Sequence, residues 1–225
     1  QSLAQHRKLE LPAVLELLSA MEYRAAGPLT GPEVQCLVDQ TEQLFRRHTR
    51  LAAGATAPLL VRLSPRQLDE LEWRLAERDA EYLIADSEER AERRERRFLK
   101  RIERWTGRLE QSQRDLVRSA SRETPDLALP WLNYRKGRQQ LLLELLRTNN
   151  EQESIRQFLV SWWVDLAGRP DALRRSTDAA TLRFVELLSR LSFTLSSEQR
   201  ETLVGRVREL RTGLGVVLKP EALQV

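Results

Sequence analysis

The sequence predicts an all-α protein, a single domain of about seven to eight amphipathic helices packed antiparallel. The first observation is composition: good helix formers dominate the 225 residues, which include only 9 Gly and 9 Pro. The second is periodicity, because apolar residues recur at helical spacing, as at Phe98, Ile102 and Trp105. Isoleucine is scarce and β-branched runs are nearly absent, which disfavours strands.

The predicted helices of the N-terminal half are bounded by Pro, Gly and capping residues. Pro12 is expected to break or kink the first helix, and Gly27-Pro28 to end it. The second helix follows Thr30 and is expected to close at Gly54. A third helix begins after Ser64. A long charged helix begins at Asp86 or Ser87 and runs through Leu109.

The remaining predicted helices span 111–122, 130–148, 154–166, 179–191 and 196–214. Gly168-Arg169-Pro170 is the clearest turn, and Gly213 and Gly215 are expected to end the last helix. No Gly/Ser linker and no shift in composition marks a boundary, so residues 1–225 are expected to form one domain.

Charge and cysteine content narrow the classes of function. The net charge is only +4 with acids interleaved among the basic residues, which is weak support for nucleic-acid binding, so no nucleic-acid partner is expected. The single cysteine, Cys36, lies among apolar residues and is expected to be a small buried hydrophobe. The sequence has no run of about 20 apolar residues, so it predicts no membrane span.

No pattern of catalytic residues stands out, so the chain is expected to be non-catalytic, with no cofactor and no metal. His6 and His48 are isolated, and neither a Gly-rich phosphate loop nor G-x-S-x-G is present. A glycan hydrolase would need two carboxylates facing each other across a cleft. The acids of the third helix are instead expected to form solvated ion pairs with nearby arginines; these acids are Asp69, Glu70, Glu72 and Asp79.

A pattern L-x-x-x-Q recurs at 63–67 and 195–199, with a degenerate copy at 109–113. In the first two copies Ser would be the N-cap and Gln the third helical residue, with Leu as a hydrophobic staple. This capping role is the favoured interpretation. The pattern also resembles the Leu-Thr-x-x-Gln motif of periplasmic chaperones of the Spy and CpxP type. That resemblance implies that helical surfaces hold unfolded clients without ATP.

Two groups of residues are candidates for partner binding. The charged helix carries nine basic and five acidic residues between Glu88 and Arg108. A solvated face is the favoured interpretation, and contact with anionic headgroups or an acidic partner is the alternative. Its candidates are Arg93, Arg97, Arg101 and Arg104.

The second group is aromatic: Trp131, Tyr134, Trp162 and Trp163. A wide buried stripe is the favoured interpretation, and an anchor for a partner protein is the alternative, because Trp is enriched at interface hot spots. Since neighbouring residues on a helix lie about 100° apart, Trp162 and Trp163 are not expected to face one core together.

The order of segments resembles a family of proteobacterial lipoproteins of unknown function. The likeness lies in the opening His6-Arg7-Lys8-Leu9-Glu10-Leu11-Pro12, in Leu63 to Glu72, in Arg101 to Leu109 and in the closing Leu195 to Leu210. It implies an export signal and a lipidated cysteine upstream of Gln1. The domain would then face the periplasm of a Gram-negative cell, with the outer membrane as the expected carrier of the anchor.

These expectations give a non-catalytic module of the bacterial envelope that binds an envelope protein or has a structural role, or alternatively an ATP-independent chaperone for unfolded clients. Membrane contact is expected only through the upstream lipid anchor. The sequence leaves the oligomeric state and the identity of the partner open.

Overall fold

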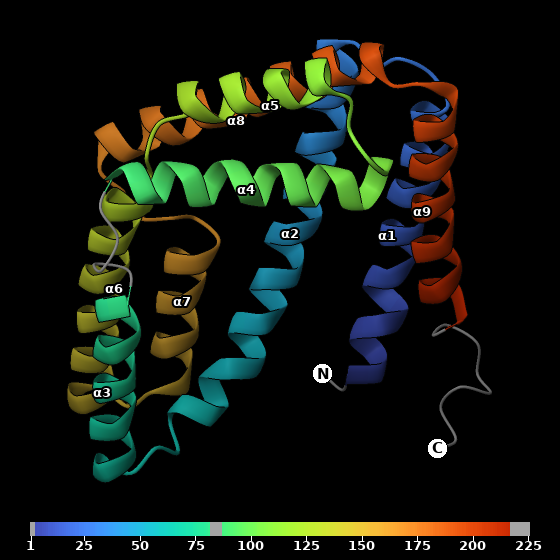
Figure 1. The fold of residues 1–225 in the computed structure, drawn as a ribbon. Coiled ribbons are helices and arrows are strands. Elements are labelled where there is room, and N and C mark those ends of the chain that lie inside the picture. The colour runs from blue at the N-terminus through green and yellow to red at the C-terminus, as the bar shows by residue number, and fades with distance from the viewer. Residues whose placement is uncertain (1–2, 82–86, 217–225) are drawn as a thin grey trace. The chain divides into compact units, whose positions relative to one another are not determined.

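A computed structural model describes residues 3–81 and 87–216, and in that part of the chain all regular secondary structure is helical (Figure 1). The all-α prediction is therefore confirmed. The described residues form nine helices, slightly more than the seven to eight expected: α1 (Leu3–Ala25), α2 (Gly31–Leu60), α3 (Pro65–Glu81), α4 (Ser87–Thr106), α5 (Gln111–Glu123), α6 (Ala128–Thr148), α7 (Gln152–Trp163), α8 (Asp171–Thr194) and α9 (Ser197–Val216).

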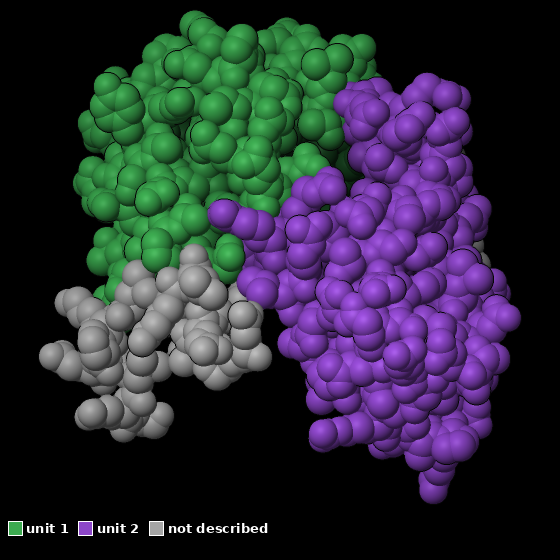
Figure 2. All heavy atoms as spheres, turned by 180° about the vertical axis from the view of Figure 1, so that it is seen from behind, with its two compact units in different colours: residues 1–45, 91–124, 180–225 green, residues 46–90, 125–179 purple. Residues whose placement is uncertain are grey.

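The chain divides into two compact units, each built from separated stretches of sequence (Figure 2). Unit 1 comprises residues 1–45, 91–124 and 180–225, and unit 2 comprises residues 46–90 and 125–179. The single-domain organisation expected from the sequence stays a prediction.

Unit 1 contains a helix pair and a three-helix core. Helices α1 and α9 lie side by side and run in opposite directions (Figure 1). Glu22 of α1 joins them, because Arg208 and Arg211 of α9 donate to its carboxylate at 2.7 and 3.0 Å. These two guanidinium groups, Arg208 first, hold the pKa of Glu22 below its usual value. The core of α4, α5 and α8 is a cluster of buried aliphatic residues: Leu99, Leu109, Val117, Leu187 and Leu191.

Unit 2 has its own core, to which four helices contribute. Ala53 and Ala57 of α2 let neighbouring helices approach closely because their side chains are small. The larger buried members come from α3, α6 and α7: Leu68, Leu142, Leu146, Ile155 and Leu159. These residues recur three or four positions apart within each helix, as the helical period requires.

Several predicted helix ends are wrong because the helices are longer. Helix α1 passes through Pro12, and α2 passes through Gly54 and Pro58 to end at Leu60. A Cβ added at Gly54 would meet no atom within 4 Å, so no close approach explains the residue. A glycine in a helix disfavours it by about 1 kcal/mol. Burial of Ala53 and Ala57 on either side of Gly54 offsets that amount.

The C-terminal helices differ from expectation in the same direction. Helix α8 begins at Asp171, well before the predicted 179, and α9 continues through Gly213 and Gly215. Two helices end earlier than predicted: α7 ends at Trp163 instead of 166, and α4 ends at Thr106, where Gly107 takes a φ of 78°, the left-handed conformation that glycine adopts without strain. Helix α4 begins at Ser87; the alternative start, Asp86, lies outside the described residues.

Candidate functional site

The two L-x-x-x-Q copies at 63–67 and 195–199 cap helix starts, as the favoured interpretation predicts. In α3 the backbone N–H of Ser64 donates to Oε1 of Gln67 at 2.9 Å, and in α9 that of Ser196 donates to Oε1 of Gln199 at 3.0 Å. Each serine hydroxyl in turn accepts from the backbone N–H of its glutamine, at 3.4 and 3.2 Å. The preceding Leu of each copy packs against a core cluster or belongs to one.

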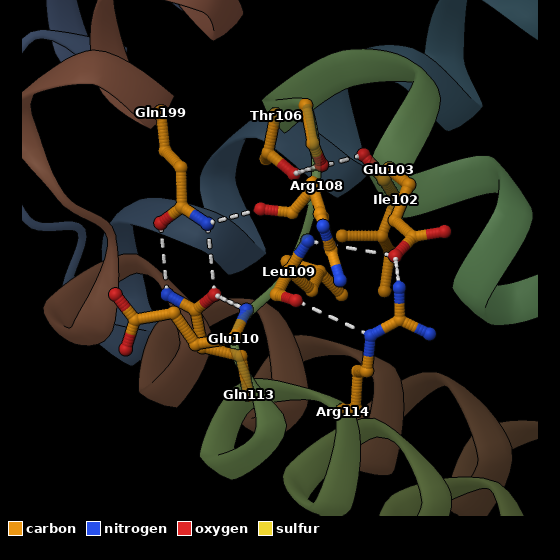
Figure 3. A network of polar contacts seen from close by, with 10 residues as sticks. Ile102, Glu103, Thr106, Arg108, Leu109, Glu110, Gln113, Arg114 and Gln199 are labelled. Carbon is orange, nitrogen blue, oxygen red and sulfur yellow. Dashed lines mark hydrogen bonds and ion pairs between the residues drawn. The ribbon is translucent and has the colours of Figure 1, made fainter.

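The copies at 109–113 and 195–199 also meet each other, which the sequence analysis did not foresee (Figure 3). The buried amides of Gln113 and Gln199 exchange two hydrogen bonds, at 2.9 and 2.8 Å. Each amide also donates to a backbone carbonyl, Gln113 to Thr194 and Gln199 to Arg108, both at 2.8 Å. The only sequence signal for this pair is the repeat of the motif itself. The glutamines therefore join α5 to α9 inside unit 1 rather than offering a surface to a client.

One acid of α3 is not solvated, which corrects the sequence analysis. Asp79 is only 2% exposed and pairs with Arg135 of α6. The acids Asp69 and Glu72 of the same helix remain exposed and both accept from Arg147 of α6. Asp79 and Arg135 are 56 residues apart, so the spacing of charges within α3 could not reveal the pair.

Helix α4 separates its charges between two faces. Its acids Glu95 and Glu103 turn toward α5, where Arg118 and Arg114 pair with them. These two acids therefore do not interrupt the basic face, whereas Glu92 stays exposed and pairs with Arg96 at 3.1 Å.

The outward face of α4 carries five exposed cations: Arg93, Arg97, Lys100, Arg101 and Arg104. At 3.6 residues per turn they lie within an arc of about 100° and along about 16 Å of the helix. Arg97 donates to the backbone oxygen of Arg93 at 3.2 Å. Among the described residues, no carboxylate pairs with Lys100, Arg101 or Arg104. All four arginines singled out from the sequence therefore share one exposed face.

The four aromatic candidates split between two helices of unit 2. Trp131 and Tyr134 of α6 meet edge to face with ring centroids 5.7 Å apart. Tyr134 is buried and its hydroxyl donates to the backbone oxygen of Ala167 at 3.0 Å. Burial raises the pKa of this phenol, while the charges of Arg138 and Arg169 lower it.

The expectation for the adjacent tryptophans is wrong. Trp162 and Trp163 of α7 are both half-buried against the unit 2 core, with ring centroids 6.2 Å apart. The reason is the size of the indole, which lets two neighbours at the end of a helix reach the same cluster from different sides.

An apolar groove of about 620 Å³ lies in unit 2, between α6 and the stretch that leads into α8. Leu129 and Leu141 of α6 are exposed along it, while Tyr134 and Leu173 line it as buried side chains. Of the described residues that line the groove, none is acidic. Two smaller hollows in unit 1 are lined largely by ion-paired side chains of α5 and α8.

Arg138 supplies the only charge among the described lining residues, and the sequence analysis did not single it out. Its guanidinium carbon lies 4.3 Å from the centroid of the Phe158 ring, a cation–π contact. On another side is Gly168, where an added Cβ would lie 3.9 Å from Nη1 of Arg138. The buried Nε of Arg138 has no hydrogen-bond partner.

Two searches of the described residues bear on other classes of site. No group of three or more His, Cys, Asp or Glu lies together there in a way that could hold a metal ion. Across the same residues, no helix combines the length and the apolar character that a membrane crossing needs.

Comparison with known proteins adds a family. Residues 1–163 match the Family of unknown function (DUF6279). The chain belongs to this family. No curated protein and no solved structure matches it. The DUF6279 match takes in the basic face of α4 and all of α6, and it ends at Trp163, before the second wall of the groove at 168–173.

Proposed function

We propose that this chain is a non-catalytic, periplasm-facing lipoprotein domain that binds another envelope protein through the outward face of α4. The proposed location rests on the resemblance to proteobacterial lipoproteins described in the sequence analysis. The observation that carries the binding role is the separation of charges on α4. Its acids Glu95 and Glu103 are held against α5, and the exposed arc is wholly basic.

The partner surface that suits this face is acidic. Guanidinium groups bind carboxylates in two-pronged geometry, and complementary charge at an interface speeds association and selects the partner. Binders of single-stranded nucleic acid also need aromatic side chains on which bases stack. Of the two aromatic side chains of α4, Phe98 packs against the unit 1 core and Trp105 is half-buried, so neither is fully exposed on the basic face. We therefore keep nucleic acid outside the proposal.

A charge-reversal experiment tests this role. The variant carries Arg97→Glu, Arg101→Glu and Arg104→Glu together, and the control carries Arg50→Glu, Arg66→Glu and Arg78→Glu. All six arginines are exposed and the two variants change the net charge equally. Each is immobilised and exposed to envelope extract, and the retained proteins are quantified. We expect one set of acidic proteins on the wild type and the control, reduced about tenfold or more on the α4 variant.

Equal retention by all three proteins, or equal loss from both variants, would refute binding through α4. A parallel measurement uses anionic vesicles and double-stranded DNA. If either of these binds the α4 face in preference to the retained proteins, the partner class is wrong even though the face is right.

A chaperone of the Spy and CpxP type is the second candidate. It is favoured by large apolar side chains exposed in unit 1: Tyr23 at 85%, Phe45 at 65% and Phe193 at 60%. Such surface can hold an unfolded chain. The test is whether an equimolar amount of the domain suppresses light scattering by a denatured client. No suppression would remove this candidate, and suppression that Phe45→Ser with Phe193→Ser abolishes would support it.

A further inference from the structure

The apolar groove of unit 2 has the size of a ligand site. Its volume of about 620 Å³ falls within the roughly 300–1,000 Å³ of small-molecule sites in proteins. From Leu129 to Leu141 the groove follows α6 for about 18 Å, given the rise of 1.5 Å per residue. Both leucines are exposed, at 36% and 47%.

A glycine lies in the middle of the groove without a packing reason. Gly137 is inside α6, where glycine disfavours the helix, and a Cβ added there would meet no atom within 4 Å. Nothing in the described chain approaches it. The space above Gly137 is therefore open to a ligand that lies along the helix.

The groove also offers one positive charge. The guanidinium of Arg138 lies between the Phe158 ring and the turn at Gly168, and no described carboxylate pairs with it. Arg169 lies close enough for its charge, like that of Arg138, to act on Tyr134. An apolar groove with an unpaired guanidinium complements a molecule that is apolar along its length and anionic at one end.

We infer that this groove binds a single alkyl chain with an anionic head, the chain lying over Gly137 and the head beside Arg138. An extended peptide suits it less. The N–H and C=O groups of a peptide need partners, and those of α6 are already used within the helix. An alkyl chain needs no such partners. The head could be a carboxylate or a phosphate, which share this chemistry.

Calorimetric titration of the purified protein with sodium dodecanoate, kept below its micelle concentration, tests the inference. Affinity should rise about fourfold with each added methylene through the series octanoate, decanoate and dodecanoate, because each methylene is buried. Dodecanol should bind more weakly than dodecanoate by about tenfold or more, because it lacks the charge that pairs with Arg138.

Two variants locate the site. Gly137→Leu should fill the groove and lower the affinity for dodecanoate about tenfold or more. The matched control, Gly205→Leu in α9, is also helical with no atom within 4 Å of an added Cβ, and should bind as the wild type does. Arg138→Met should remove the preference for dodecanoate over dodecanol. Thermal unfolding of each variant confirms that it is folded.

The inference fails if Gly137→Leu binds dodecanoate as tightly as the wild type. It fails equally if dodecanol matches dodecanoate, or if an apolar peptide with a free carboxyl terminus displaces dodecanoate at lower concentration, which would make a protein the occupant. Dodecyl phosphate distinguishes the two heads: tighter binding than dodecanoate indicates a phosphate ligand, and weaker binding a carboxylate.

Discussion

At the scale of single residues, the buried amides of Gln113 and Gln199 use their full hydrogen-bonding capacity within unit 1. Each oxygen accepts two bonds, one from the other amide and one from a backbone N–H, that of Glu110 or Ser196. Each nitrogen donates two, as an amide can. A buried polar pair satisfied in this way holds one arrangement of α5 and α9 in preference to others.

We expect Gln113→Leu to lower the free energy of unfolding by about 2–3 kcal/mol, because the buried Gln199 amide loses one hydrogen bond at its oxygen and one at its nitrogen, and the Thr194 oxygen loses the bond from Gln113. The control is Gln67→Leu, which removes an exposed capping residue of the same type and should cost at most about 1 kcal/mol. Urea unfolding followed by circular dichroism measures both. Equal effects would mean that capping, not the buried pair, accounts for the contribution of Gln113.

Asp79 and Asp69 provide a second comparison, on one helix. Asp79→Ala removes the buried carboxylate that pairs with Arg135, and we expect the free energy of unfolding to fall by about 3 kcal/mol. Asp69→Ala removes a carboxylate that is 74% exposed and should change stability by less than about 1 kcal/mol. The same urea titration compares them, and a larger effect at Asp69 would contradict the burial described here.

At this scale the sequence predicted local interactions well and distant ones poorly. The capping hydrogen bonds of Ser64 and Ser196 join residues three apart, so the motif alone indicates them. The pairing of Gln113 with Gln199 joins residues 86 apart, and burial of Asp79 depends on where α6 places Arg135. Arg138 was missed for the same reason, because only the fold brings Phe158 and Gly168 beside it.

At the scale of helices, replacing a glycine is expected to have opposite effects on stability at two positions. Gly137 has ordinary helical geometry in α6, whereas Gly107 ends α4 with a positive φ. We expect Gly137→Ala to stabilise the protein by about 0.5–1 kcal/mol, because alanine restricts the unfolded chain and favours the helix.

Gly107→Ala should instead destabilise it by about 1 kcal/mol or more, because alanine avoids the left-handed region. Thermal unfolding of the two variants gives the comparison. If both variants change stability in the same direction, the placement of Gly137 inside a helix and of Gly107 at a helix end is wrong.

Helix existence was predictable and helix length was not. Apolar residues at helical spacing identified the helices of the described chain, since that period reports which face is buried. Gly54 and Gly213 were taken as ends and Pro12 as a break or kink, although each lies within a helix. Local preferences of about 1–3 kcal/mol at such residues are outweighed by packing of the turns on either side.

At the scale of the whole molecule, the described chain holds two core clusters, one in each unit. Each unit draws on separated segments, so its residues alternate along the sequence with those of the other unit. No single point in the sequence therefore separates the two units, which explains why no boundary was visible in the sequence.

The two cores make separate predictions for hydrogen exchange. Leu159→Ala in unit 2 and Leu187→Ala in unit 1 should each cost about 2–5 kcal/mol, because both side chains are fully buried. We expect the first to speed amide exchange most within 46–90 and 125–179, and the second most within 91–124 and 180–216. Mass spectrometry of exchanged peptides measures this, and identical exchange patterns in the two variants would contradict two separate cores.

The positive charge of the exposed arc of α4 makes its interactions depend on the salt concentration. Dissolved salt changes the distance over which this charge acts, because the screening length is about 8 Å at physiological ionic strength and about 3 Å at 1 M. Association through this face should therefore weaken as the salt concentration rises.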